Sequence, residues 1–210
     1  MTSRRLWDIS QPVRVGIPVW PGDTAYGEER TWAIGPGCPV NVSRLTLSSH
    51  TGTHADAPLH YDADGVPAAG LDLDRYIGPA LLLHIPPGQP AVTVAQLEGR
   101  VPAGTVRLLL RTYDRFPQGG WRSDFTAMDA GCVDWLAARG VQLIGVDAPS
   151  LDPQDSKTLS AHHAVRRHGM GILEGLVLDD VPEGTYELVA LPLKLATADA
   201  APVRAVLREL

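Results

Sequence analysis

The hydrophobic residues of this chain fall into short runs of a few residues, separated by glycine, proline and polar positions. Such runs are typical of buried β-strands. They predict strands over residues 42–48, 80–85, 106–111, 141–146 and 186–193. None of them approaches the length of about 20 residues that a membrane-spanning helix requires, so we expect no membrane partner.

Helical patterns are fewer. They cover residues 93–97, 129–139 and 160–167, and a last amphipathic piece over 203–210 is expected to dock the C-terminus. The first helix opens with a capping-box pair, Thr93 and Gln96. Gly140 follows the second and can adopt the left-handed conformation that ends a helix. In the third, Ser160 is placed as the N-cap and Gly169 follows the end.

The order of these elements favours a mixed α/β or α+β fold. The helix over 129–139 and the strand after it form half of a βαβ unit, whereas the other predicted strands have no helix between them. The chain has 210 residues with 21 Gly and 18 Pro, which indicates many turns and few helices. No repeat or linker divides it, so we expect one domain over residues 1–210.

Charge and cysteine content argue against several classes of protein. Asp and Glu number 24 against 18 Lys and Arg, a net charge of −6, and no basic face is visible, which disfavours a nucleic-acid partner. Cys38 and Cys132 form no CxxC pair, so neither a disulfide framework nor a thiolate zinc site is expected. No apolar stretch follows Arg4 and Arg5, as a signal peptide requires, and we therefore expect a cytoplasmic protein.

Three histidines and an aspartate lie within residues 50–60. In an extended chain His50, His54, Asp56 and His60 project from the same side, because side chains alternate along a strand. His54 and Asp56 are then about 7 Å apart, whereas His50 would be about 13 Å from His54. We therefore expect Gly52 to turn the chain back. Imidazole and carboxylate groups are ligands of zinc and related ions, and the alternative is a polar loop of surface or cavity residues.

A second polar cluster lies far along the chain. His162 and His163 fall in the first turn of the third predicted helix, and Glu174 comes shortly after its end. A further imidazole and a second carboxylate would complete a two-metal site, because a carboxylate can bridge ions about 3.5–4 Å apart. Solvent-facing or packing positions are the alternative for these histidines.

The motif His-x-Gly-Thr-His-x-Asp-x-Pro-x-His over residues 50–60 resembles the signature of the metal-dependent cyclase family, which includes the bacterial kynurenine formamidases. Other segments match in order and spacing: Leu-Trp-Asp-Ile-Ser at 6–10, Pro-Val-Trp-Pro-Gly-Asp at 18–23, Pro-Val-Asn-Val at 39–42, Ala-His-His at 161–163 and Ile-Leu-Glu-Gly at 172–175. The resemblance runs from Leu6 to the last predicted strand. It implies a mixed α/β, barrel-like, cyclase-like fold that usually forms a homodimer.

The resemblance also implies a site with two Zn²⁺ ions in each subunit. His50, His54 and Asp56 would hold one ion. Asp56, His162 and Glu174 would hold the other, with both carboxylates bridging, and the spacing to Glu174 selects His162.

Two further residues match family roles. His60 matches the proton-transfer histidine, with His163 the next candidate, and Trp20 matches the aromatic substrate contact. The implied activity is an arylformamidase reaction, in which N-formyl-L-kynurenine is hydrolysed to L-kynurenine and formate in tryptophan degradation. Zinc lowers the pKa of bound water to about 7, and a histidine titrates near neutral pH, so both suit this hydrolysis.

Alternative functions stay open. A related hydrolase of a cyclic amide or another acyl substrate would carry the same signature, because the signature fixes the metal chemistry and not the pocket. A non-catalytic zinc protein is the other alternative. Structural zinc sites are usually closed by four protein ligands, whereas His60 is a surplus residue here, which favours catalysis. A serine hydrolase is disfavoured because the chain has no Gly-x-Ser-x-Gly elbow, and Asp147 and Ser150 are assigned to a turn.

Overall fold

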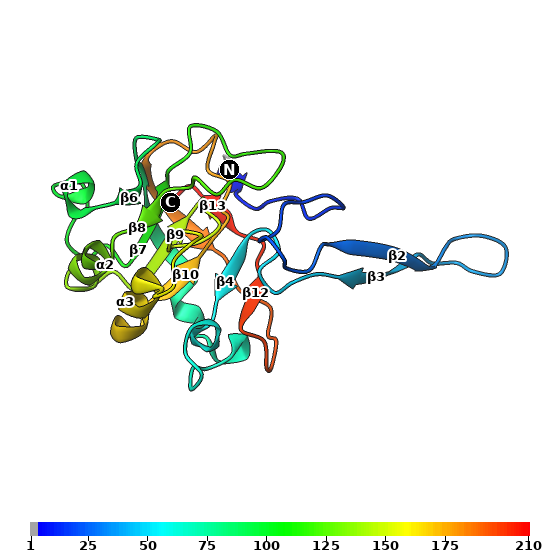
Figure 1. Ribbon diagram of the computed structural model, residues 1–210. Coiled ribbons are helices and arrows are strands. Elements are labelled where there is room, and N and C mark those ends of the chain that lie inside the picture. Colours follow the sequence, from blue (N-terminus) through cyan, green and yellow to red (C-terminus); the bar gives the residue numbers. More distant parts are fainter. Residues whose placement is uncertain (1–3) are drawn as a thin grey trace.

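A seven-stranded mixed sheet forms the centre of the structure, a computed structural model that describes residues 4–210 (Figure 1). Its strands lie in the order β1 (Leu6–Asp8), β13 (Val206–Arg208), β11 (Gly184–Val189), β5 (Ile77–His84), β7 (Arg107–Arg111), β9 (Leu143–Val146) and β10 (Gly171–Leu173). Strands β1, β13, β11 and β5 pair antiparallel, whereas β5, β7, β9 and β10 pair parallel. The sheet curls into a half-barrel, which confirms the mixed, barrel-like fold expected from the sequence.

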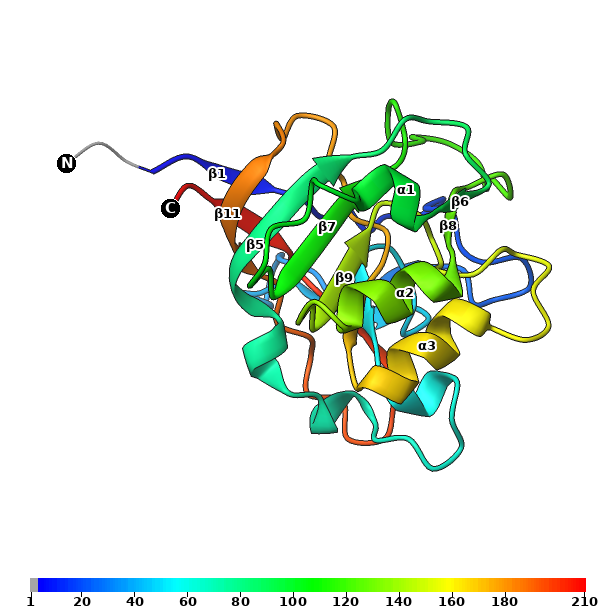
Figure 2. The same ribbon diagram turned by 90° about the vertical axis from the view of Figure 1, so that its left-hand side faces the viewer.

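Both faces of the parallel part of the sheet are buried. The helices α1 (Val94–Leu97), α2 (Ala130–Ala137) and α3 (Ser160–His168) cover one face (Figure 2). In β7, Leu108 and Leu110 belong to the same hydrophobic cluster as Val133 and Leu136 of α2. Leu109 points the other way, into a second cluster. A strand covered on both sides is apolar at successive positions, which is why this segment reads as a continuous hydrophobic run.

The strongest sequence patterns correspond to elements of the structure. Each of the five predicted strands overlaps one of β3 (Val42–Thr46), β5, β7, β9 and β11, and the first three helical patterns overlap α1, α2 and α3. The capping box of Thr93 and Gln96 is present, and Gly140 follows α2 with a φ of 91°. The parallel pairs β7–β9 and β9–β10 have α2 and α3 in their connections, so the predicted half unit extends to two βαβ units.

The predicted N-cap of α3 is wrong. Leu159 occupies that position with a φ of 44° and makes no side-chain cap, and Ser160 is the first helical residue. The carboxylate of Asp152 performs the function instead, because its two oxygens each accept a backbone N–H of the first turn, from Ala161 and His162, at 3.0 Å. The cap therefore comes from a residue outside the local sequence window in which capping patterns are found.

The last amphipathic piece, which its pattern groups with the predicted helices, forms a strand instead of a helix. Its centre is the strand β13, which pairs with β1 on one side and β11 on the other. Leu207 is buried, whereas Val206 and Arg208 are more exposed, so the exposure alternates with the period of a strand. Two available partner strands outweigh a helical pattern in so short a segment.

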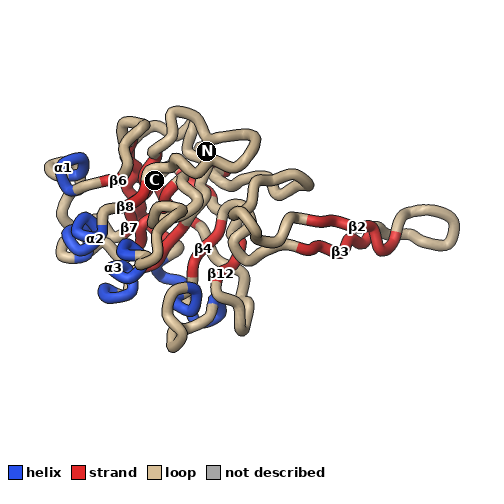
Figure 3. Tube along the Cα trace, viewed as in Figure 1, coloured by secondary structure: helices blue, strands red, loops and turns tan. Residues whose placement is uncertain are grey.

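Short elements complete the structure. Strand β4 (His54–Asp56) pairs antiparallel with β12 (Ala200–Pro202), and β6 (Ala91–Val92) pairs parallel with β8 (Ala127–Met128). Strands β2 (Gly27–Trp32) and β3 form a hairpin that projects from the rest of the molecule (Figure 3). The 3-10 helices cover Pro58–His60, Ala68–Gly70 and Leu73–Arg75. Within residues 4–210, none of the helices has the length and apolar character needed to cross a membrane.

We predict that Gly145→Ala destabilises the protein. A Cβ at Gly145 would lie 2.5 Å from Cδ2 of Leu109 and 2.9 Å from Cδ1 of Leu176, and both leucines are fully buried. Overpacking of this kind costs about 1–3 kcal/mol of unfolding free energy. Urea unfolding checks it, with Gly35→Ala as the control because nothing lies within 4 Å of a Cβ at Gly35. Equal stabilities for the two variants would contradict the packing argument.

Candidate metal centre

Three segments that are distant in the sequence converge beside β4. Within β4, Ala55 packs into the second hydrophobic cluster, so its neighbours His54 and Asp56 point to the other side of the strand, as predicted. The backbone N–H and C=O of His54 bond to the C=O and N–H of Glu174, at 3.2 and 3.0 Å. His162 comes from the first turn of α3. Strand pairing and one helix start therefore bring the side chains together.

The turn predicted at Gly52 is present. Gly52 has a φ of 70°, in the left-handed region that favours glycine. Thr53 fixes the turn, because its hydroxyl donates to the carbonyl of Gly175 at 2.7 Å and accepts the backbone N–H of Gln11 at 2.9 Å. The ring of His50 consequently lies 4.9 Å from the ring of His54, centroid to centroid.

Two buried carboxylates each face histidines on two sides. Asp56 Oδ1 lies 3.1 Å from His50 Nδ1 and 3.3 Å from His54 Nε2. The other oxygen of Asp56 lies 3.3 Å from His162 Nε2. Glu174 likewise places one oxygen 3.3 Å from His54 Nε2 and the other 3.6 Å from His162 Nε2.

The donor atoms of this cluster suit a metal ion. His54 Nε2 and both oxygens of Asp56 are buried and have no hydrogen-bond partner among the described residues. Buried polar atoms are normally paired, so these atoms need a ligand that they can share. The donor atoms of His50, His54 and Asp56 all lie within 4.8 Å of one another, and so do those of Asp56, His60 and His162. Nitrogen and oxygen donors in this number are typical of Zn²⁺ and related ions.

The second ring nitrogen of each inward-facing histidine has an acceptor behind it. His54 Nδ1 lies 3.0 Å from the carbonyl of Gly52, and His162 Nδ1 lies 2.6 Å from Asp152. Carbonyl and carboxylate oxygens only accept, so these nitrogens carry a hydrogen, and Nε2 is the nitrogen that presents a lone pair to the cluster once its own proton leaves. Each ring is therefore oriented so that loss of its second proton leaves the tautomer that a metal ligand requires.

Charge compensation sets the protonation of the cluster. Burial lowers the pKa of His54, but the carboxylates of Asp56 and Glu174 outweigh it and raise the pKa to about 10. His162 behaves in the same way, with Asp152 and Asp56 raising its pKa to about 10. Burial raises the pKa of Asp56, but its three histidine neighbours outweigh that effect and hold the pKa well below the usual range. In the metal-free protein, the protonated histidines therefore supply the positive charge that balances the buried carboxylates.

A cavity of about 380 Å³ opens onto the cluster. His50, His54, His60, His162 and Glu174 lie at one part of its lining. Its other walls include the aromatic residues Trp20, Tyr113, Phe116 and Trp121. The rings of Trp20 and Trp121 pack edge to face, with centroids 5.1 Å apart. The cavity therefore joins a polar, metal-compatible floor to an apolar wall suited to a flat ring.

The structure brings the five proposed metal ligands and His60 together, and Trp20 lines the same cavity, whereas His163 does not line it. Of the adjacent histidines in α3, His162 is buried in the cluster and His163 is exposed, so the rotation of the helix selects between them. Asp147, assigned to a turn, accepts the backbone N–H groups of Thr112 and Tyr113 at 2.8 and 2.9 Å. Burial raises the pKa of Asp147 to about 6.

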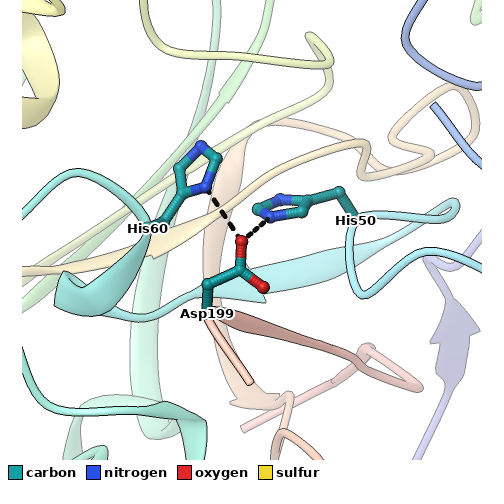
Figure 4. Close-up of side chains that lie close together, drawn as sticks. All are labelled: His50, His60 and Asp199. Carbon is teal, nitrogen blue, oxygen red and sulfur yellow. Dashed lines mark hydrogen bonds and ion pairs between the residues drawn. The ribbon is translucent and has the colours of Figure 1, made fainter. Parts of the chain in front are cut away.

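Two acidic residues of the site are missing from the sequence analysis. Asp152 anchors His162, and Asp199 lies 3.0 Å from His50 Nε2 and 3.3 Å from His60 Nδ1 (Figure 4). Asp199 is 139 positions from His60, and no local pattern connects them. Asp152 precedes α3 too far upstream for a capping pattern to reveal it.

Comparison with known proteins places the chain among related sequences. Residues 7–153 match the model of the cyclase family, described as "Putative cyclase". Kynurenine formamidase of Maricaulis maris (strain MCS10) is 58% identical over 206 residues, covering 98% of this chain and 99% of the relative. Kynurenine formamidase of Erythrobacter litoralis (strain HTCC2594) is 56% identical over 209 residues, covering 100% and 96%. A solved structure described as a potential metal-dependent hydrolase with cyclase activity superposes with a TM-score of 0.84 at 28% identity, covering 99% of both chains.

We predict that metal binding to this cluster releases protons. The pKa values of His54 and His162, about 10, exceed the usual value of histidine, so the metal-free protein keeps both rings protonated at pH 7. A metal ion must displace those protons. Its apparent affinity should therefore rise as the pH increases from 7 toward 10, by up to about tenfold per pH unit for each proton released.

Calorimetric titration of the metal-free protein with Zn²⁺, in buffers of different protonation enthalpy, counts the protons released. His162→Ala should reduce the count, whereas His163→Ala should leave it unchanged because His163 is exposed. Binding with no proton release at pH 7 would contradict the prediction.

Proposed function

The chain belongs to the cyclase family, and we propose that it is a metal-dependent hydrolase that cleaves N-formyl-L-kynurenine to L-kynurenine and formate. The observation that carries this proposal is the cluster of buried carboxylates and histidines at the floor of an aromatic-lined cavity. The two kynurenine formamidase relatives, which match the chain over nearly its whole length, support the choice of substrate.

We infer that each chain binds two Zn²⁺ ions. His50, His54 and Asp56 would hold one ion, and Asp56, His162 and Glu174 would hold the other. Asp56 and Glu174 could each bridge the two ions, because each carboxylate has one oxygen near His54 and the other near His162. Such ions polarise an acyl oxygen and make water a strong nucleophile at neutral pH.

His60 is the residue that would move the proton. Its ring lines the cavity, and its side chain is 34% exposed, so substrate and water can reach it. Hydrolysis breaks the bond between the formyl carbon and the aniline nitrogen, and the nitrogen needs a proton to leave as an amine. His60 would take that proton from the attacking water and return it to the nitrogen.

The walls of the cavity suit the remainder of the substrate. Trp20 would contact the aromatic ring, a packing interaction worth about 0.5–1.5 kcal/mol beyond burial. Arg122 is the one Lys or Arg side chain among the described residues that line the cavity. Its guanidinium, 52% exposed and bonded to Asp124 at 2.9 and 2.6 Å, would pair with the α-carboxylate of the substrate. A neutral cyclic amide has no such group.

We predict different failures for Asp56→Ala and His60→Ala. One oxygen of Asp56 faces His50 and the other faces His162, so its loss should remove metal and activity together. His60→Ala should keep about two zinc ions, with kcat lower by about 10²- to 10⁴-fold and KM little changed. Zinc stoichiometry, kcat and KM on N-formyl-L-kynurenine are the measurements.

The same assay tests the proposed function. The wild-type enzyme should release formate from N-formyl-L-kynurenine and lose this activity on chelation. Faster turnover of isatin, in which the aryl amide is closed into a ring, would instead favour a cyclic-amide hydrolase. Zinc that is bound without any hydrolysis would favour a structural site. Loss of metal from His60→Ala would make His60 a ligand, which its place near Asp56 and His162 allows.

We predict that Arg122→Gln raises KM for N-formyl-L-kynurenine by about two- to fivefold, the range expected for an exposed ion pair. KM for formanilide, which lacks the amino-acid carboxylate, should not change. Asp124→Asn is the matched control. It removes the carboxylate that competes for Arg122 but keeps the guanidinium, so it should not raise KM. An equal rise in KM for both substrates would show that Arg122 does not recognise the carboxylate.

A further inference from the structure

Asp199 lies between two histidines of the site and contacts both with one oxygen. Its Oδ2 is 3.0 Å from Nε2 of His50 and 3.3 Å from Nδ1 of His60, whose rings approach to 4.2 Å between centroids (Figure 4). Its Oδ1 accepts the hydroxyl of Ser49 at 2.8 Å. All three side-chain contacts of this carboxylate are therefore with residues of one segment, 49–60.

The backbone holds Asp199 in this place. The next residue begins β12, where Ala200 pairs with Asp56. The carbonyl of Asp199 itself accepts the N–H of Ala57 at 2.9 Å. The strand pair that presents Asp56 to the cluster thus also presents Asp199 from its other strand.

The contact determines which nitrogen of each ring is free. A carboxylate only accepts hydrogen bonds, so the ring nitrogens facing it carry the hydrogens. In His50 the nitrogen left for a metal ion is then Nδ1, which faces Asp56 at 3.1 Å and would lose its own proton when the ion binds. His60 keeps a lone pair on Nε2, the atom left to exchange a proton with substrate or water.

His60 depends on this contact more than the other histidines do. Asp199 is the one hydrogen-bond partner of its ring among the described residues. The ring is partly exposed and belongs to the short 3-10 helix Pro58–His60, and its contact with the His50 ring does not fix which of its nitrogens carries the hydrogen. A proton-transfer group that is free to rotate spends less time in the reactive geometry.

We propose that Asp199 is a positioning residue that fixes the orientation and tautomer of His60, and at the same time those of His50. This inference rests on the proposed function for the role of His60, whereas its His50 part concerns metal affinity alone. Asp199 would touch neither substrate nor metal, and its effect on the rate would pass through His60.

The test is a double-mutant cycle measured with saturating Zn²⁺. Asp199→Ala should lower kcat on N-formyl-L-kynurenine by about 10- to 100-fold, with KM changed less than about threefold. Truncation leaves neither partner buried and unpaired, because the His60 side chain is 34% exposed and His50 still faces Asp56. Asp199→Asn, which retains an acceptor oxygen, should recover part of the loss. In the His60→Ala background, Asp199→Ala should cause no further loss of kcat.

Zinc affinity provides a readout that does not depend on turnover. Competition with a chelator should show that Asp199→Ala binds Zn²⁺ about 10- to 100-fold more weakly, as expected when an outer-shell partner of a ligand is removed. The number of ions at saturation should stay the same. Ser49→Ala, which removes only the third contact of Asp199, is the matched control and should have a much smaller effect on both quantities.

The outcomes separate this inference from the proposed function. A wild-type enzyme that does not hydrolyse N-formyl-L-kynurenine contradicts the proposed function, and the zinc titration still tests the effect on His50. An undiminished kcat in Asp199→Ala, or an equal further loss in the His60→Ala background, overturns the positioning role. An ion that cannot be restored at saturating Zn²⁺ also overturns it, because Asp199 would then be a ligand.

Discussion

Two carboxylates, Asp56 and Glu174, are buried side by side within reach of three imidazole rings, and the surrounding structure depends on this arrangement. An isolated buried carboxylate is costly, so each one requires a cation close to it. The protein meets this requirement with histidines, whose protons a metal ion can replace. The backbone of His54 pairs with that of Glu174, so the two carboxylates lie on neighbouring segments and cannot separate without breaking the pairing.

The acceptors behind the histidines connect the fold to the chemistry. Asp152 caps α3 and also anchors the ring of His162, so one residue fixes both the start of the helix and the direction of a donor atom. The carbonyl of Gly52 does the same for His54 through the turn that glycine permits. Orientation of the rings therefore comes with folding and does not wait for a ligand.

The polar end and the aromatic wall of the cavity are built from different kinds of element. Its polar end is built from strand ends and the first turn of a helix, which are rigid elements that hold donor atoms at fixed distances. Its aromatic wall comes largely from loops, with Trp20 and Trp121 packed against each other.

The sequence by itself determined what depends on local periodicity. Alternation placed His54 and Asp56 on one side of a strand, Gly52 marked the turn that returns His50, and the apolar runs marked the central strands. Only the tertiary structure decided what depends on pairing between distant segments: the capping of α3 by Asp152, the strand at the C-terminus, and the place of Asp199. Local patterns fix the direction of a side chain relative to its own backbone, whereas its neighbours are set by strand pairing and helix packing across the whole chain.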